Sequence, residues 1–215
     1  MSKQKKIFYL GFHKTGSTSF GELMTILGYK SQTYYKTYSE PFVNKLKNND
    51  LSEVFEITDK YDAFDDDPWF LFYKEFEQRY ENALFVLYER DPEKWYESCF
   101  YFFGRANTPM REFIYGKGKG CNLYNKDHHI SIYKQHSENV RNFFQDKPEK
   151  FLEIHDLTDK SAQAVAKFIG NETSGVKFPH MNSTRLSALD KFIIRSKLNL
   201  AKLLNLDEVY VSRDE

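Results

Sequence analysis

The sequence has no excess of charge of either sign, few cysteines and no long apolar run. Its 31 basic residues balance 31 acidic ones over 215 residues, so bulk attraction to nucleic acid is not expected. Two cysteines, Cys99 and Cys121, do not make a disulfide framework, which favours a reducing compartment. The apolar run at the basic N-terminus is too short for a signal peptide or membrane anchor. We therefore predict a cytoplasmic protein with neither a nucleic-acid nor a membrane partner.

What the sequence does contain is an alternation of short apolar runs with segments of helical periodicity. The apolar runs predict strands at 7–10, 61–64, 83–88 and 151–154. The helical patterns lie at 17–27, 41–47, 68–80, 92–103, 130–144 and 161–169. This alternation is typical of a parallel sheet with helices on both faces. With 40% hydrophobic residues, the chain fits an α/β fold, a single three-layer domain over residues 1–215.

Three local patterns add detail to this outline. Residues 104–127 are rich in glycine, include the run GKGKG, and are predicted to form a long loop or lid. Residues 187–206 predict a last amphipathic helix. Asp67 followed by Pro68 predicts a helix that begins there, with the aspartate as its N-cap.

The stretch GFHKTGSTS, residues 11–19, is close to a phosphate-binding loop but departs from the usual pattern. Nucleoside-triphosphate loops read G-x-x-x-x-G-K-[ST], and here Ser17 follows Gly16 where the lysine belongs. The stretch has a single lysine, Lys14, before that glycine. A loop between a strand and a helix directs backbone N–H groups and the positive end of the helix dipole at one anion. An anion site is therefore predicted, with Lys14 as its mobile charge.

The displaced lysine argues against a triphosphate. In triphosphate loops the missing lysine reaches the β and γ phosphates, and magnesium needs a carboxylate that usually ends a core strand. The strand at 83–88 is followed by Glu89 and Arg90 instead. Arginine has a planar fork that suits phosphate, and Ser98 on the following helix can complete such a site. Taken alone, a surface salt bridge of Arg90 with Asp91 explains the pattern equally well.

Taken together, HKTGSTS and YERDPEKWYES resemble the sulfotransferase family that uses 3′-phosphoadenosine 5′-phosphosulfate, over roughly residues 7–182. DDDPWFLFYKEFEQRYENALFVLYERDPEKWYES and FPHMN resemble the branch with a D-x-P motif. The resemblance implies a P-loop-type fold without a metal, in which the first motif holds the 5′-phosphosulfate. Its residues are His13, Lys14, Thr15, Gly16, Ser17, Thr18 and Ser19. The resemblance also implies that Arg90 and Ser98 hold the 3′-phosphate.

The implied reaction moves a sulfuryl group to a hydroxyl or amine acceptor and releases adenosine 3′,5′-bisphosphate. Lys14 would stabilise charge on the leaving phosphate, and Asp66 of the D-x-P motif would be the general base. Asp65, Asp67 and a histidine remain alternatives for the base. The histidines to consider are His13, His128, His129 and His136. No metal site is predicted, because His129 and His136 share a helix face without a further ligand at metal spacing.

Two other functions remain open from the sequence: a P-loop kinase acting on a small molecule, and a non-catalytic nucleotide-binding module. The acceptor is not readable, so small-molecule, carbohydrate and lipid hydroxyls all stay possible. His180 and Asn182 of FPHMN could border the pocket or cap a turn. The sequence assigns no role to the GKGKG run and no oligomeric state.

Overall fold

The computed structural model describes residues 5–171, 173–179 and 186–213. The chain forms two compact units, which we call the sheet unit and the second unit. The sheet unit comprises Met1–Tyr35, Leu51–Arg90 and Gln135–Asn182. The second unit comprises Lys36–Asp50, Asp91–Lys134 and Ser183–Glu215.

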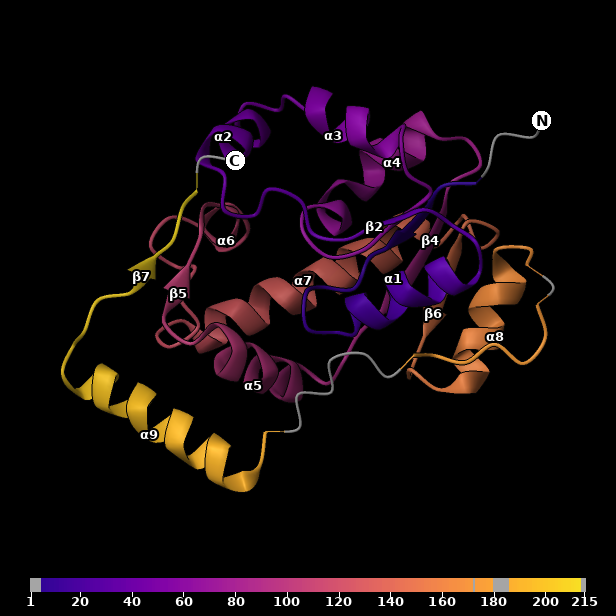
Figure 1. Cartoon of the computed structure of the whole chain (residues 1–215). Coiled ribbons are helices and arrows are strands. Elements are labelled where there is room, and N and C mark those ends of the chain that lie inside the picture. The colour runs from indigo at the N-terminus through magenta and orange to yellow at the C-terminus, as the bar shows by residue number, and fades with distance from the viewer. Residues whose placement is uncertain (1–4, 172, 180–185, 214–215) are drawn as a thin grey trace. The chain divides into compact units, whose positions relative to one another are not determined.

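The sheet unit is built on a five-stranded parallel sheet with the order β2-β3-β1-β4-β6 (Figure 1). Its strands are β1 (Ile7–Tyr9), β2 (Ser31–Gln32), β3 (Ala63–Phe64), β4 (Leu84–Tyr88) and β6 (Phe151–Ile154). The central strand β1 has β3 on one side and β4 on the other, so the strand order reverses around it. In open parallel sheets, ligands bind beyond the carboxyl ends of the strands at such a reversal. The topology therefore brings the loops after β1, β3 and β4 together.

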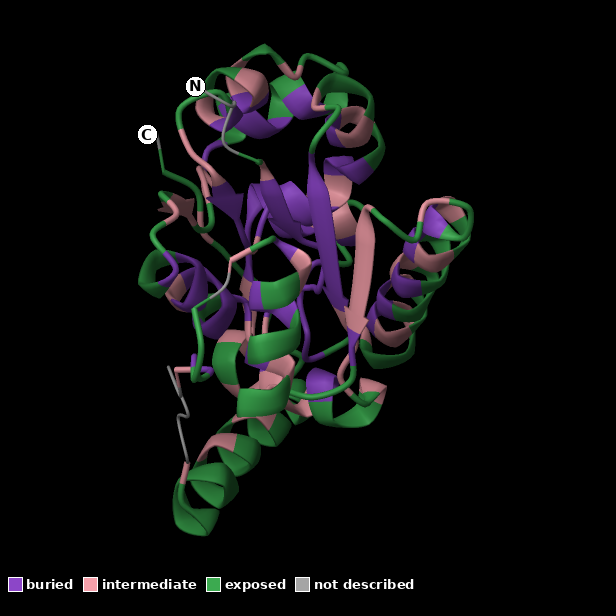
Figure 2. Cartoon of the chain, turned by 90° about the vertical axis from the view of Figure 1, so that its right-hand side faces the viewer, coloured by how far each residue is buried: buried purple, intermediate pink, exposed green. Residues whose placement is uncertain are grey.

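Successive residues of β1 point to opposite faces of the sheet, and each face is covered by helices. Ile7 and Tyr9 belong to an apolar core shared with α1 (Ser17–Ile26) and α8 (Asp159–Phe168). Phe8 faces an aromatic layer on the other side, where its ring stacks on those of Phe64, Phe76 and Phe85. Figure 2 shows the central strands in purple, buried between these layers, whereas β6 is mostly of intermediate burial. The predicted fold class, a parallel sheet flanked by helices, is confirmed.

Helices that pack on the sheet contribute further rings to the aromatic layer. Phe76 comes from α4 (Tyr73–Arg79), which follows a 3₁₀ turn, η1 (Trp69–Phe72), and contacts Phe55 of α3 (Ser52–Thr58). Phe144 ends α7 (Lys126–Phe144) and packs on Phe85, with ring centroids 4.7 Å apart. Aromatic rings from strands and helices thus pack together on this side of the sheet.

The second unit is mainly helical. It contains α2 (Glu40–Lys47), α5 (Pro92–Phe103), α6 (Pro109–Tyr115), α9 (Ala188–Leu203), the first part of α7, and the strand pair β5 (Ala106–Asn107) and β7 (Val209–Tyr210). Its core holds Arg111, whose Nε donates to the Gly120 carbonyl at 2.8 Å and whose guanidinium lies 4.1 Å from the Phe103 ring centroid. Cys99 and Cys121 are buried and free, as expected.

Several sequence-based expectations need correction. Residues 104–127 are not one long loop, because they contain β5 and α6; Thr108 accepts from the Arg111 amide and caps α6. Asp67 is not a helix cap, because Pro68 precedes η1 and no side chain caps that turn. α3 and β2 were not expected. The remaining predicted strands and helices are present within a few residues of their expected bounds, including the helix predicted at 187–206.

Candidate active site

The loop after β1 is held tightly against the end of β4. A Cβ on Gly11 would lie 2.8 Å from the Tyr88 carbonyl oxygen and 2.6 Å from Thr15 Oγ1, so only glycine fits there. Thr15 Oγ1 donates to the Phe12 carbonyl at 2.5 Å, and the Tyr9 hydroxyl donates to the Thr15 carbonyl at 3.0 Å. The Thr15 hydroxyl therefore orders the loop from inside, where its side chain is buried.

The helix that follows the loop begins without a side-chain cap. Its N-cap is Gly16, at φ 100°, and its first turn contains no acidic residue. The first amides of a helix have no partner within the helix and carry the positive end of its dipole. Ser17 and Ser19 are buried at this end, whereas Thr18 is exposed. Lys14, at φ 64°, is half-buried on the loop just before it. Such a terminus fits an anion.

Asp66, the predicted base, is bonded to the first residue of α1. The Ser17 hydroxyl donates to Asp66 Oδ2 at 2.9 Å, and the Asp67 amide donates to Asp66 Oδ1 at 2.9 Å. Asp66 has a φ of 72°, a left-handed conformation that is costly for a residue with a side chain. Burial and the neighbouring Asp67 carboxylate raise the pKa of Asp66, against the opposing effects of His13 and these hydrogen bonds.

Asp67 is paired with a histidine of the loop. His13 Nδ1 lies 3.3 Å from Asp67 Oδ1, and both side chains are buried. The Asp67 carbonyl also accepts from the Tyr35 amide at 2.9 Å. Ligand atoms of His13, Asp66 and Asp67 lie within 4.8 Å of one another, a grouping that could hold a metal ion. Asp67 is thus a partner of His13, where the sequence suggested a helix cap.

Asp65 faces away from the α1 terminus. Its carboxylate accepts from the Thr33 hydroxyl at 3.1 Å and lies against Gly21, in the middle of α1. Burial, reinforced by the Asp66 carboxylate, raises the pKa of Asp65 well above its usual range. This carboxyl is built into the packing between β3 and α1, away from the end of the helix that Ser17 begins.

Arg90 lies beside the loop, as the sequence suggested for an anion ligand. Its Nη1 is 3.5 Å from the Lys14 carbonyl oxygen. The two basic residues of the predicted donor site, Lys14 and Arg90, are therefore neighbours in the sheet unit. Ser98 is half-buried on α5 of the second unit, and its pairing with Arg90 stays a prediction. His180 and Asn182 lie outside the described residues.

His136 supports the loop from beneath, a role that the sequence did not reveal. Its Nε2–H donates to the Leu10 carbonyl at 2.8 Å, and its ring packs against Phe12 and Phe70. Burial lowers the pKa of His136 to about 4, so the ring is neutral at neutral pH. A ring nitrogen of His128 donates a hydrogen bond to the Tyr115 carbonyl, and one of His129 donates to the Lys119 carbonyl. No periodic pattern marks these contacts, because each joins residues of different elements or loops.

Comparison with known families decides the assignment. The family model of the sulfotransferase domain matches residues 6–186. The chain belongs to the sulfotransferase family. The matched span includes the loop after β1, Asp66, Arg90 and Ser98, and it ends before α9. No curated protein matches the chain. Among the described residues, no helix combines the length and apolar character needed to cross a bilayer.

Proposed function

We propose that this sulfotransferase transfers a sulfuryl group from 3′-phosphoadenosine 5′-phosphosulfate to a hydroxyl or amine acceptor. The observation that carries the proposal is the hydrogen bond between Ser17 Oγ and Asp66 Oδ2, 2.9 Å long. It joins the uncapped helix terminus, where an anionic donor would bind, to a carboxylate that can take a proton. The proposed donor-binding site and the proposed base therefore lie next to each other. The free cysteines fit a reducing compartment, and we propose a cytoplasmic location.

The residues present fit a donor with two anionic ends. The N-terminus of α1 offers its first amides, including that of Ser17, and the Thr18 and Ser19 hydroxyls for the phosphosulfate, with Lys14 as a compact charge. Arg90, beside Lys14, offers a planar guanidinium for the 3′-phosphate. We propose that the Ser98 hydroxyl also binds this phosphate. His13 and Thr15 contribute indirectly, His13 through its pairing with Asp67 and Thr15 by ordering the loop. The donor supplies the activated sulfuryl group.

In this mechanism, Asp66 accepts the proton of the acceptor hydroxyl as its oxygen bonds to sulfur. The bond between sulfur and the bridging phosphate oxygen breaks, and adenosine 3′,5′-bisphosphate leaves. Lys14 and the first amides of α1 stabilise the negative charge that grows on that oxygen. The raised pKa of Asp66 makes it a stronger base than an ordinary aspartate. Ser17 holds the carboxylate in place at the helix terminus.

A second candidate, a metal-dependent P-loop kinase, is favoured by one observation. His13, Asp66 and Asp67 could hold a divalent ion beside the loop. Against it stand the serine after Gly16, where a kinase loop has lysine, and the arginine after β4. A non-catalytic nucleotide-binding module is the third possibility, and it predicts that loss of Asp66 changes nothing.

The donor is tested by thermal shift. We expect adenosine 3′,5′-bisphosphate to raise the melting temperature without metal, and magnesium ATP to have little effect. Arg90→Ala should weaken binding of the bisphosphate by about 1.5–3 kcal/mol, the usual size of a charge-assisted hydrogen bond. Binding of adenosine 5′-phosphosulfate, which lacks the 3′-phosphate, should not change. Arg79→Ala, which breaks an exposed pair with Asp59, is the matched control. A shift with magnesium ATP alone would contradict the proposal. Labelled donor incubated with cell extract would then identify the acceptor.

A further inference from the structure

The last helix, α9, is attached to the second unit along a narrow face. Ala201 is buried, Ile194 and Leu198 are half-buried, and every other residue of the helix is exposed. The buried face packs on a small cluster with Cys121 and Leu123. In Figure 2, α9 is the mostly exposed helix at the bottom. The helix lies beyond residue 186, where the match to the sulfotransferase domain ends. Its surface therefore calls for an explanation of its own.

The exposed face of α9 is strongly apolar. The spacings of three, four, seven and eleven residues place these side chains on one face of a helix. They are Leu189 at 66% exposure, Phe192 at 69%, Ile193 at 41%, Leu200 at 55%, Leu203 at 78% and Leu204 at 58%. Scattered exposed apolar residues are ordinary, but six of them on one face, interrupted only by Ser196, mark an interaction site. We call it the α9 face.

Basic side chains flank the α9 face on both edges. The helix has four basic residues, Lys191, Arg195, Lys197 and Lys202, and one acidic residue, Asp190. Helical periodicity places Lys197 along one edge of the α9 face and Arg195, which pairs with Glu97, beyond the other edge. Asp190 is occupied in the capping box with Ser187. An apolar face between basic edges is the pattern of helices that lie in the plane of an anionic membrane surface.

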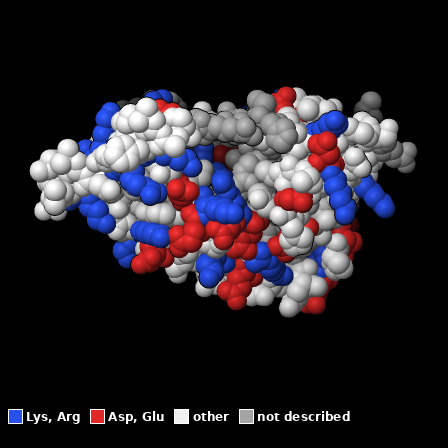
Figure 3. Space-filling view, turned by 90° about the horizontal axis from the view of Figure 1, so that it is seen from below, with Lys and Arg blue, Asp and Glu red and all other residues white. Residues whose placement is uncertain are grey.

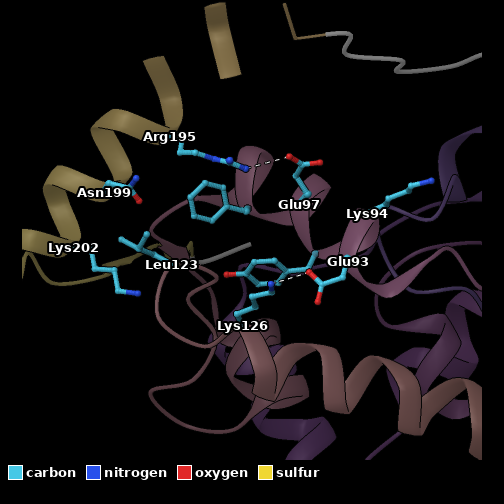
Figure 4. A pocket seen from close by; sticks show the side chains of 10 residues that line it. Glu93, Lys94, Glu97, Leu123, Lys126, Arg195, Asn199 and Lys202 are labelled. Atoms are coloured by element: carbon cyan, nitrogen blue, oxygen red, sulfur yellow. Dashed lines mark hydrogen bonds and ion pairs between the residues drawn. The ribbon is translucent and has the colours of Figure 1, made fainter. Parts of the chain in front are cut away.

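A pocket of about 430 Å³ beside α9 continues the basic edge. Figure 4 shows Arg195, Asn199 and Lys202 of α9 on one wall and Glu93, Lys94 and Glu97 of α5 on another. Tyr96, Phe100 and Leu123 line its apolar part. Glu93 pairs with Lys126 at 2.8 Å and Glu97 with Arg195 at 3.2 Å. Four basic and two acidic residues line the pocket, so positive side chains outnumber negative ones beside α9.

We propose that the second unit docks on an anionic lipid membrane through the α9 face. The apolar side chains would enter the boundary between head groups and acyl chains, and the lysines would meet lipid phosphates and carboxylates. A second copy of the chain fits this surface less well, because paired α9 helices would bring their positive charges together. The inference departs from the sequence-based expectation of no membrane partner. It does not rest on the proposed function, although a docked enzyme would be well placed for a lipid acceptor.

The test is cosedimentation of the full chain with vesicles. We expect binding to vesicles of phosphatidylcholine with about one third phosphatidylserine, and at least tenfold weaker binding to phosphatidylcholine alone or in high salt. Phe192→Glu with Leu203→Glu should abolish it. The control Ile26→Glu places the same charge at a residue that is 56% exposed on α1, and should leave binding intact. Lys197→Ala should weaken binding about fivefold, and Lys167→Ala on α8 should not.

The remaining outcomes are equally decisive. Binding that ignores phosphatidylserine, or no binding at all, overturns the proposal. The oligomeric state is measured alongside by sedimentation velocity. If the wild type is a dimer that Phe192→Glu dissociates, and vesicles are not bound, the α9 face is an interface between copies. Unchanged melting temperatures of the variants show that the second unit is still folded. Activity is not read in these assays, so their result stands apart from the sulfotransferase mechanism.

Discussion

At the scale of the residue, the position of Lys14 is the clearest difference between this loop and a triphosphate-binding loop. It has a φ of 64° at the end of the anion loop, a conformation that residues with side chains seldom adopt. If Lys14 meets the charge that grows on the leaving oxygen, it acts mainly in the transition state. Lys14→Ala should lower single-turnover rates by roughly 10²–10³-fold, as does loss of one preorganised donor to an oxyanion. Bisphosphate affinity, measured by titration, should fall much less.

Lys36 provides a matched control for this substitution, because it is also a lysine at positive φ, 47°, but in the second unit. Lys36→Ala should leave the chemical step unchanged. Lys14→Arg should rescue poorly, since a flat fork does not replace a compact ammonium. A collapse of bisphosphate affinity, with a normal rate at saturating donor, would make Lys14 a passive anchor instead.

Asp66 should set the acidic limb of the pH profile. Burial and Asp67 raise its pKa, so the carboxylate forms at higher pH than for an ordinary aspartate. The rate should therefore rise with pH through that raised pKa and level off above it, where the base is fully ionised. Asp66→Asn should still fold and bind bisphosphate, and should lose most turnover at every pH. If the limb survives in Asp66→Asn and disappears in a His13 variant, His13 is the base.

The same residues show what sequence reasoning can and cannot find. Lys14, Asp66 and Arg90 stand in recognisable motifs, so roles could be proposed for them from the sequence. The contacts that organise them join distant residues: Ser17 with Asp66 across 49 positions, and His136 with Leu10 across 126. Periodicity is a local signal, and a lone histidine in a helix carries no sign of the carbonyl that it will meet.

At the scale of the element, the junction of the loop with α1 depends on a glycine in the left-handed conformation. Gly16 has a φ of 100°, and a Cβ there would lie 2.2 Å from Leu157 Cδ1. Gly28, at the other end of α1, has a φ of 87° and open space around it. Both alanine variants should lose about 1–2 kcal/mol for the left-handed conformation. Gly16→Ala alone should also displace the helix terminus and lower bisphosphate affinity, measured by calorimetry. If the two variants bind the bisphosphate with equal affinity, the N-terminus of α1 is not part of the donor site.

Elements with a strong local signal were predicted well, and weak ones were not. α1, α5 and β4 have clear periodicity or caps, such as Asp91 before Pro92. β2 has two residues and α3 has seven, too short for either period to show. α6 is different, because Thr108 and Pro109 are a proper helix start that the glycines of its surroundings obscured. The strand order, which creates the site, follows from tertiary packing.

At the scale of the whole molecule, the charge balance leaves donor binding to the site itself. The formal net charge is zero, and Figure 3 shows basic and acidic side chains intermingled on one face. The electrostatic field of the whole molecule therefore adds little to the attraction of an anionic donor. The charges near the loop after β1 are of two kinds. Lys14 and Arg90 are basic, and His13, Asp66 and Asp67 form a group of possible proton acceptors or metal ligands. Whether that group holds a metal or serves as a base separates the two enzyme classes.

We expect turnover to be independent of added metal. If Asp66 takes the acceptor proton, its carboxylate must stay accessible, and EDTA should change turnover less than twofold. Added zinc should inhibit, because His13, Asp66 and Asp67 offer ligand atoms within 4.8 Å and an occupied Asp66 cannot accept a proton. His13→Gln should relieve that inhibition, and EDTA should reverse it in the wild type. A large loss of turnover in EDTA, restored by magnesium alone, would instead make these three residues a metal site and favour the kinase.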